Sequence, residues 1–186
     1  INKYYFMRNA YIKSTGSFAP EKIIPNQYFN ELLGEDVNTW LVENLNIRER
    51  RWCSENESTS FLCIEAANFA LVNANMKPEE LDLIIISTDT PEYISPSTAS
   101  VVQYKLGAKN AGTFDINTAC AGFVTALDVA SKYIRSDERY NNILVIGAYA
   151  MSKYLDMTDK KTVTLFADGA GAVILSANEN VDRGFL

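Results

Sequence analysis

The chain has 186 residues, of which 47% are apolar, and its 17 basic and 23 acidic residues leave a net charge of −6. This composition is typical of one well-filled globular domain and excludes a disordered chain. The negative charge argues against nucleic acid or an anionic membrane as a partner, and no apolar run approaches the length of a membrane span.

The first 75 residues are predicted to form one strand followed by three helices. The strand covers residues 10–17, and the helices cover 25–33, 37–45 and 58–75. In the third helix a single buried face is predicted from the spacing of Leu62, Ala66, Phe69 and Ala70. Cys63, within the same helix, is expected to be a packing residue.

A charged stretch, NIRERRW, follows the second helix at residues 46–52. A solvated loop is the default interpretation of such a run. The functional alternative is a positive rim that binds phosphates or an acidic carrier protein.

The second half of the chain alternates strands with helices. Strands are predicted at 81–87, 113–117 and 142–147, a helix at 97–106, and one or two strands around a glycine-rich bend at 162–176. This alternation indicates an α/β fold with a mostly parallel sheet and helices on both of its faces.

Cys120 follows the strand at 113–117 and lies at the predicted start of a helix. Between Ala119 and Val129 only Thr125 and Asp128 are strongly polar, which predicts a helix in the centre of a domain. A thiol in the first turn of a helix would face free N–H groups and the positive end of the helix dipole, which lower its pKa and favour the nucleophilic thiolate. The alternative is a small buried apolar residue, the commonest role of a free cysteine.

The sequence contains three cysteines, Cys53, Cys63 and Cys120, and no histidine. An odd number of cysteines without close pairing makes a zinc site or a disulfide framework improbable, and predicts no metal and a reducing, cytoplasmic setting. Without histidine, a Cys–His dyad or a histidine base cannot form within these residues. Either the chemistry uses other groups, or part of the site lies elsewhere.

A glycine-rich run, DGAGA, occupies residues 168–172 and continues directly into apolar residues. A dinucleotide-binding fingerprint requires such glycines between a strand and a helix. We therefore interpret these glycines as positions where backbones pack closely.

Residues 115–123, DINTACAGF, resemble the nucleophile motif of the β-ketoacyl-acyl-carrier-protein synthase III family of condensing enzymes. Three further stretches fit the same family in the same order: NIRERR at 46–51, PSTA at 96–99 and LFADGAGA at 165–172. The resemblance covers nearly the whole chain. It implies the N-terminal half of a thiolase-like fold over residues 1–186, with a mixed five-stranded sheet, and a C-terminal half that is absent from these residues.

The resemblance also implies a reaction and its partners. Cys120 would take an acyl group from a coenzyme A or acyl-carrier-protein thioester, and malonyl-acyl carrier protein would then condense with it after losing CO₂. The family uses no cofactor beyond its thioester substrates. In this family the histidine and the asparagine that assist decarboxylation come from the C-terminal half, and so does a second oxyanion donor. It forms homodimers in which the strand at 113–117 would pair with its own copy.

The resemblance assigns coenzyme A binding to Trp40, which would stack on the adenine, and to Lys153, which stands where the family has an arginine. Asn44 replaces a second arginine of this clamp, and the two changes leave room for a specialised member of the family, such as one serving secondary metabolism. Ser95 stands where acetyl-priming members carry a phenylalanine that closes the partner subunit's acyl pocket, which predicts a preference for longer or bulkier acyl groups.

Two other hypotheses remain open at this stage. An acyl-Cys120 intermediate could instead serve acyl transfer or head-to-head condensation of two acyl chains. The chain could also be a non-catalytic thiolase-fold subunit, although such a subunit has no use for Cys120.

Overall fold

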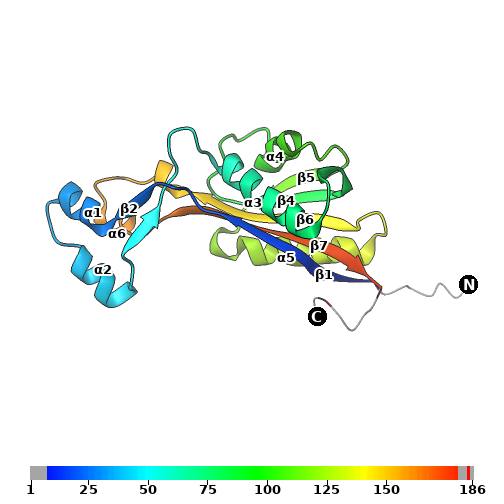
Figure 1. The fold of residues 1–186 in the computed structure, drawn as a ribbon, viewed down its shortest axis with the longest axis horizontal. Helices are drawn as coiled ribbons and strands as arrows, with labels where there is room; N and C mark the ends of the chain where they lie inside the picture. The colour runs from blue at the N-terminus through cyan, green and yellow to red at the C-terminus, as the bar shows by residue number, and fades with distance from the viewer. Residues whose placement is uncertain (1–7, 180–183, 185–186) are drawn as a thin grey trace, which may run out of the picture.

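The computed structural model describes residues 8–179 and residue 184, and its centre is a five-stranded sheet (Figure 1). The strand order is β1-β7-β6-β4-β5. The strands are β1 (Asn9–Phe18), β4 (Leu83–Ser87), β5 (Gly112–Ile116), β6 (Asn142–Ala150) and β7 (Asp168–Asn178). β4 pairs in parallel with both β5 and β6, whereas β7 runs antiparallel to β6 and to β1. The predicted mixed sheet is confirmed, with its parallel pairing confined to β6, β4 and β5.

Helices cover both faces of the sheet, as predicted (Figure 1). α3 (Thr59–Ala74) and α4 (Thr98–Leu106) lie on one face, and α5 (Gly122–Ser136) lies on the other. Side chains alternate along β4, so Ile84 and Ile86 pack toward α3 while Leu83 and Ile85 pack toward α5. All four of these side chains are nearly or fully buried, which accounts for the unbroken apolar run of this strand.

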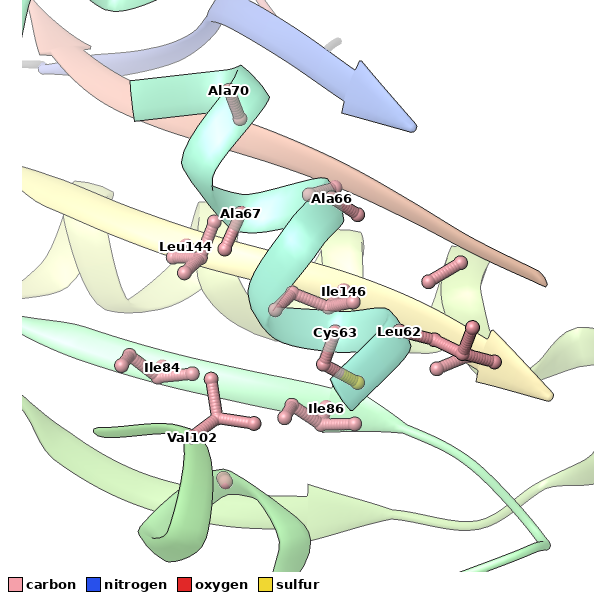
Figure 2. Packing of buried hydrophobic residues seen from close by; sticks show 14 of the residues in the cluster. Leu62, Cys63, Ala66, Ala67, Ala70, Ile84, Ile86, Val102, Leu144 and Ile146 are labelled. Carbon is pink, nitrogen blue, oxygen red and sulfur yellow. The ribbon is translucent and has the colours of Figure 1, made fainter. Parts of the chain in front are cut away.

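α3 lies very close to the sheet through a row of small residues (Figure 2). A Cβ atom added to Gly16 of β1 would lie 2.3 Å from the Ala66 carbonyl oxygen and 2.4 Å from the Ala70 nitrogen. Cys63 is fully buried among these residues, which confirms its packing role. Phe69 was predicted on the buried face, but it is 52% exposed because the close approach leaves no room for a large ring.

A smaller lobe lies beside the sheet (Figure 1). It consists of β2 (Ile23–Pro25), β3 (Glu49–Arg51), α1 (Asn26–Leu33), α2 (Asn38–Leu45) and α6 (Lys160–Val163), and β2 pairs antiparallel with β3. The loop interpretation of residues 46–52 is therefore wrong for 49–51. Arg50 is buried, its guanidinium donates to the Ile24 carbonyl (3.1 Å) and to Asn26 Oδ1 (2.8 Å), and it lies 4.5 Å from the centre of the Phe29 ring.

Three short 3₁₀ helices complete the fold, η1 (Pro78–Glu80), η2 (Ala119–Ala121) and η3 (Met151–Lys153). Two predictions for the second half of the chain need correction. The stretch 162–176 is not one or two strands around a bend, because Thr162 and Val163 belong to α6 and β7 begins only at Asp168. α5 is not buried on all sides, since Val124 is 69% exposed on its outer face. In the described residues, no helix is both long and apolar enough to cross a membrane.

Candidate active site

Cys120 lies in η2, between the end of β5 and the start of α5. Ala119 adopts a left-handed φ of 47°, and its N–H donates to Asn117 Oδ1 at 3.2 Å. This break separates β5 from the 3₁₀ turn, and the α-helix proper starts two residues after the cysteine and not at it. Within the described residues no side chain caps α5, and Cys120 is exposed. The thiol therefore stands at an open helix start.

A cavity of about 380 Å³ adjoins Cys120 at the sheet face that α5 covers. Its floor consists of two rows of residues, and the two rows are two residues apart along the chain. The inner row is Ser87, Gly147 and Gly171, which are register partners across β4, β6 and β7. The outer row is Asp89, Tyr149 and Gly169, in which Tyr149 and Gly169 are register partners and Asp89 follows Ser87 by two residues. Phe123 and Phe166 contribute to the walls.

Gly122 explains how the Cys120 turn reaches the sheet. A Cβ atom at Gly122 would lie 2.0 Å from Ser87 Oγ, so glycine here lets α5 start directly over this hydroxyl of β4. Phe123 then packs over Gly147, where an added Cβ would lie 3.1 Å from its ring. The small residues after the cysteine therefore fix the position of the thiol relative to the floor.

The glycines of β7 have a different role from the one predicted. Among the described residues, an added Cβ at Gly171 would meet nothing within 4 Å, and one at Gly169 would meet only the Phe18 carbonyl oxygen at 3.4 Å. Close backbone packing is thus the wrong interpretation for Gly171. Because Gly171 has no side chain, the space above it stays open, and this space is part of the Cys120 cavity.

The other two cysteines are poor nucleophiles. Cys53 is buried, and burial together with the negative charge of Asp168 raises its pKa to about 12. Complete burial also raises the pKa of Cys63 well above its ordinary value. Among the described residues, no three histidine, cysteine, aspartate or glutamate side chains form a group that could hold a metal ion.

Trp40 lies on α2, is 55% exposed, and lines a second groove of about 480 Å³ together with Glu35, Lys160 and Lys161. Lys160 Nζ is 3.0 Å from Glu35 Oε1. Lys153 does not line this groove. Its Nζ donates to the Ser54 carbonyl oxygen at 3.1 Å. The structure therefore does not bring Trp40 and Lys153 into one cavity. The lysines that line the groove with Trp40 are Lys160 and Lys161.

The Trp40 groove and the Cys120 cavity share a wall made by residues 164–166. Leu165 lines the groove, and the next residue, Phe166, lines the cavity. Two side chains of the smaller lobe hold this wall: Arg50 Nη2 donates to the Thr164 carbonyl (2.8 Å), and Trp52 Nε1 donates to the Phe166 carbonyl (2.9 Å). These contacts connect sequence positions more than 100 residues apart.

Asp168 is a site residue that sequence reasoning missed. Its buried carboxylate accepts hydrogen bonds from the Cys53 N–H (2.7 Å), from the Ser152 N–H (2.9 Å) and from the Ser152 hydroxyl. Asp168 thus holds the turn at Ser152, which carries Lys153. It also holds the segment at Cys53, where the carbonyls of Ser54 and Glu55 accept from the Lys153 ammonium. The only sequence signal was an acidic residue at the edge of a glycine-rich strand, which is too common to assign.

Comparisons with known proteins agree with this architecture. A family model described as 3-oxoacyl-[acyl-carrier-protein (ACP)] synthase III matches residues 114–186. The chain is 45% identical over 173 residues to the β-ketoacyl-[acyl-carrier-protein] synthase III of Clostridium acetobutylicum, and the match covers 93% of this chain and 52% of that protein.

Two solved structures are similar in fold as well as in sequence. The 3-oxoacyl-[acyl-carrier-protein] synthase III of Aquifex aeolicus aligns with a TM-score of 0.87 and 41% identity, over 92% of this chain and 55% of that one. The priming β-ketosynthase of the R1128 polyketide biosynthetic pathway aligns with a TM-score of 0.88 and 30% identity, over 93% of this chain and 51% of that one. The chain spans about half the length of the curated relatives it matches.

Proposed function

We propose that this chain, which is similar to β-ketoacyl-[acyl-carrier-protein] synthases III over about half of their length, belongs to that family and provides the acyl-accepting cysteine of a decarboxylating condensation. The observation that carries the proposal is the exposed Cys120 just before α5, beside a cavity whose floor includes Gly147, Gly169 and Gly171. The mixed sheet, with α5 on one face and α3 and α4 on the other, supports the same assignment.

In the first step the Cys120 sulfur attacks the carbonyl carbon of an acyl thioester. A new S–C bond forms, the S–C bond to the carrier breaks, and the released thiol takes the proton that Cys120 gave up. The backbone N–H of Cys120 is the donor we assign to the developing oxyanion, because it is local to the attacked carbonyl. Acyl groups would occupy the open part of the cavity over Gly171.

In the second step malonyl-acyl carrier protein loses CO₂, and the resulting carbanion attacks the acyl carbon. A C–C bond forms, and the S–C bond to Cys120 breaks to regenerate the thiol after it takes up a proton. The 186 residues contain no histidine. We therefore propose that residues 1–186 are an N-terminal half, and that a C-terminal half supplies the neutral donors for the carbanion, as the family resemblance implies.

Coenzyme A would approach through the Trp40 groove. The shared wall at residues 164–166 makes this groove adjacent to the Cys120 cavity, so a thioester bound by its nucleotide at Trp40 could present its acyl end to the thiol. Lys160 and Lys161, which line the groove, are better placed for phosphate contact than the predicted Lys153 in this arrangement. No further cofactor is required by this chemistry.

The assembly that we propose is a homodimer. β5 ends the strand order and has β4 as its only partner among the described strands, so its other edge is available for pairing with a second copy. The cytoplasmic location inferred from the cysteines stays a prediction.

The experiment is an incubation of the full-length protein with acyl-CoA and malonyl-acyl carrier protein, followed by mass spectrometry of the carrier-bound products. A β-ketoacyl carrier two carbons longer than the donor acyl group supports the proposal. Acyl transfer without CO₂ release, or a product built from two acyl-CoA chains when malonyl carrier is omitted, would assign a different second step to the same acyl-Cys120.

A further inference from the structure

Two polar side chains in the Cys120 cavity have no part in the reaction just described. Asp89 and Tyr149 both line this cavity, and they follow the register partners Ser87 and Gly147 by two residues each. β4 ends at Ser87, so Asp89 lies in the loop after this strand, whereas Tyr149 is still within β6. Asp89 and Tyr149 therefore add a carboxylate and a phenol to the lining beyond Ser87 and Gly147.

Asp89 is the only charged side chain among the described residues that line this cavity. It lies in an exposed position, and within the described part of the chain its carboxylate forms no hydrogen bond or ion pair. A carboxylate that has no internal partner keeps its hydrogen-bonding capacity for a ligand. It also gives the cavity a negative charge that no lysine or arginine in the lining offsets.

Tyr149 lines the same cavity as Asp89, and its ring packs against Phe166 with a centroid distance of 6.0 Å. Partial burial raises the pKa of the phenol, and the negative charge of Asp89 raises it further. The hydroxyl therefore stays protonated at neutral pH and remains both a donor and an acceptor.

We propose that Asp89 and Tyr149 select the acyl group, favouring acyl chains that carry a hydroxyl or an amine and rejecting chains that end in a carboxylate. This selectivity rests on the proposed function, because it describes which acyl thioesters reach Cys120. A hydroxyl or ammonium group on the chain can donate to Asp89, whereas a terminal carboxylate would meet the like charge of Asp89.

The test compares four-carbon donors of matched size on the full-length protein. Butyryl-CoA, 3-hydroxybutyryl-CoA and succinyl-CoA are each offered, and the rate of acyl adduct formation on Cys120 is measured by intact mass spectrometry. Each adduct forms by the same exchange of one S–C bond for another, so only the acyl end differs. The same rates are measured for Asp89→Asn and Tyr149→Phe, with Glu138→Gln as a control that removes an exposed charge at the far end of the sheet.

The expected order is 3-hydroxybutyryl above butyryl, with succinyl slower than butyryl by about tenfold or more. Asp89→Asn should bring succinyl to within about threefold of butyryl, and Tyr149→Phe should reduce the advantage of the hydroxylated donor. The Glu138 control should keep the wild-type ratios. Equal rates for all three donors, or unchanged ratios in Asp89→Asn, would overturn the inference while leaving the proposed function intact. Absence of any adduct with every donor would instead overturn the proposed function, and the selectivity with it.

Discussion

The substitution Asp168→Asn replaces one carboxylate oxygen by an NH₂ group and leaves the size of the side chain unchanged. In the structure each oxygen of this carboxylate accepts from a backbone N–H, that of Cys53 at 2.7 Å and that of Ser152 at 2.9 Å. An asparagine can accept only one of these two bonds, and its NH₂ group must face the other N–H. One backbone donor is therefore left without this acceptor whichever way the amide turns, either the buried N–H of Cys53 or the partly buried N–H of Ser152.

The size of this effect follows from the lost bond. A hydrogen bond to a charged acceptor contributes about 1.5–3 kcal/mol, and an unsatisfied buried donor costs about 1–3 kcal/mol. Because these terms overlap, we expect Asp168→Asn to lower the free energy of unfolding by about 2–4 kcal/mol. Urea denaturation measures this change, and Asp89→Asn is the matched control, since its carboxylate has no hydrogen-bond partner in the described residues.

The same substitution separates the two candidate sets of phosphate-binding lysines. Asp168 holds the Ser152 turn, and with it Lys153, whereas Lys160 and Lys161 line the Trp40 groove. The KM for acyl-CoA should therefore change little, and a rise in KM at nearly constant kcat would assign the phosphate contact to Lys153. An Asp168→Asn protein whose unfolding free energy stays within about 0.5 kcal/mol of wild type would refute the hydrogen-bond argument, because such a value is typical of surface changes.

Three further predictions concern the thiols and the glycines. At pH 8 iodoacetamide should label Cys120 first, because Cys53 with a pKa of about 12 is then about 0.01% thiolate, and Cys63 is buried; equal labelling in peptide maps would contradict this. Gly171→Leu should fold normally but slow acylation of Cys120 by octanoyl-CoA by about tenfold or more, because its side chain enters open cavity; an unchanged rate would mean that acyl chains lie elsewhere. Gly16→Ala should lower the free energy of unfolding by about 3 kcal/mol or more, because its Cβ would overlap backbone atoms of α3; a urea midpoint equal to wild type would contradict the close packing.

Much of the fold could be predicted because its signals are local. Ser58 and Ser97 begin α3 and α4 as N-caps, accepting from the N–H three residues on, and Gly34 and Gly107 end helices in the left-handed conformation. The buried strand β4 was predicted from its unbroken apolar run. Each of these features depends on residues within one turn or one strand.

The features that could not be predicted depend on contacts distant in sequence. Arg50 lies in a charge run whose neighbours are solvated, and its burial follows from acceptors at Ile24 and Thr164 that no local pattern reveals. The floor of the Cys120 cavity requires the register of three strands, which places Gly171 opposite Gly147. Cys120 itself was a candidate from its local setting, but whether a cavity adjoins it could be decided only from the assembled sheet.

The central claim is that Cys120 carries the acyl group during condensation, and tandem mass spectrometry of the full-length protein tests it most directly. After incubation with acyl-CoA, the account predicts an acyl adduct on the peptide that contains Cys120, and its disappearance with release of CO₂ when malonyl-acyl carrier protein is added. Cys120→Ala should form neither the adduct nor the β-ketoacyl product. An adduct on another residue, or β-ketoacyl product formed by Cys120→Ala at the wild-type rate, would contradict the claim.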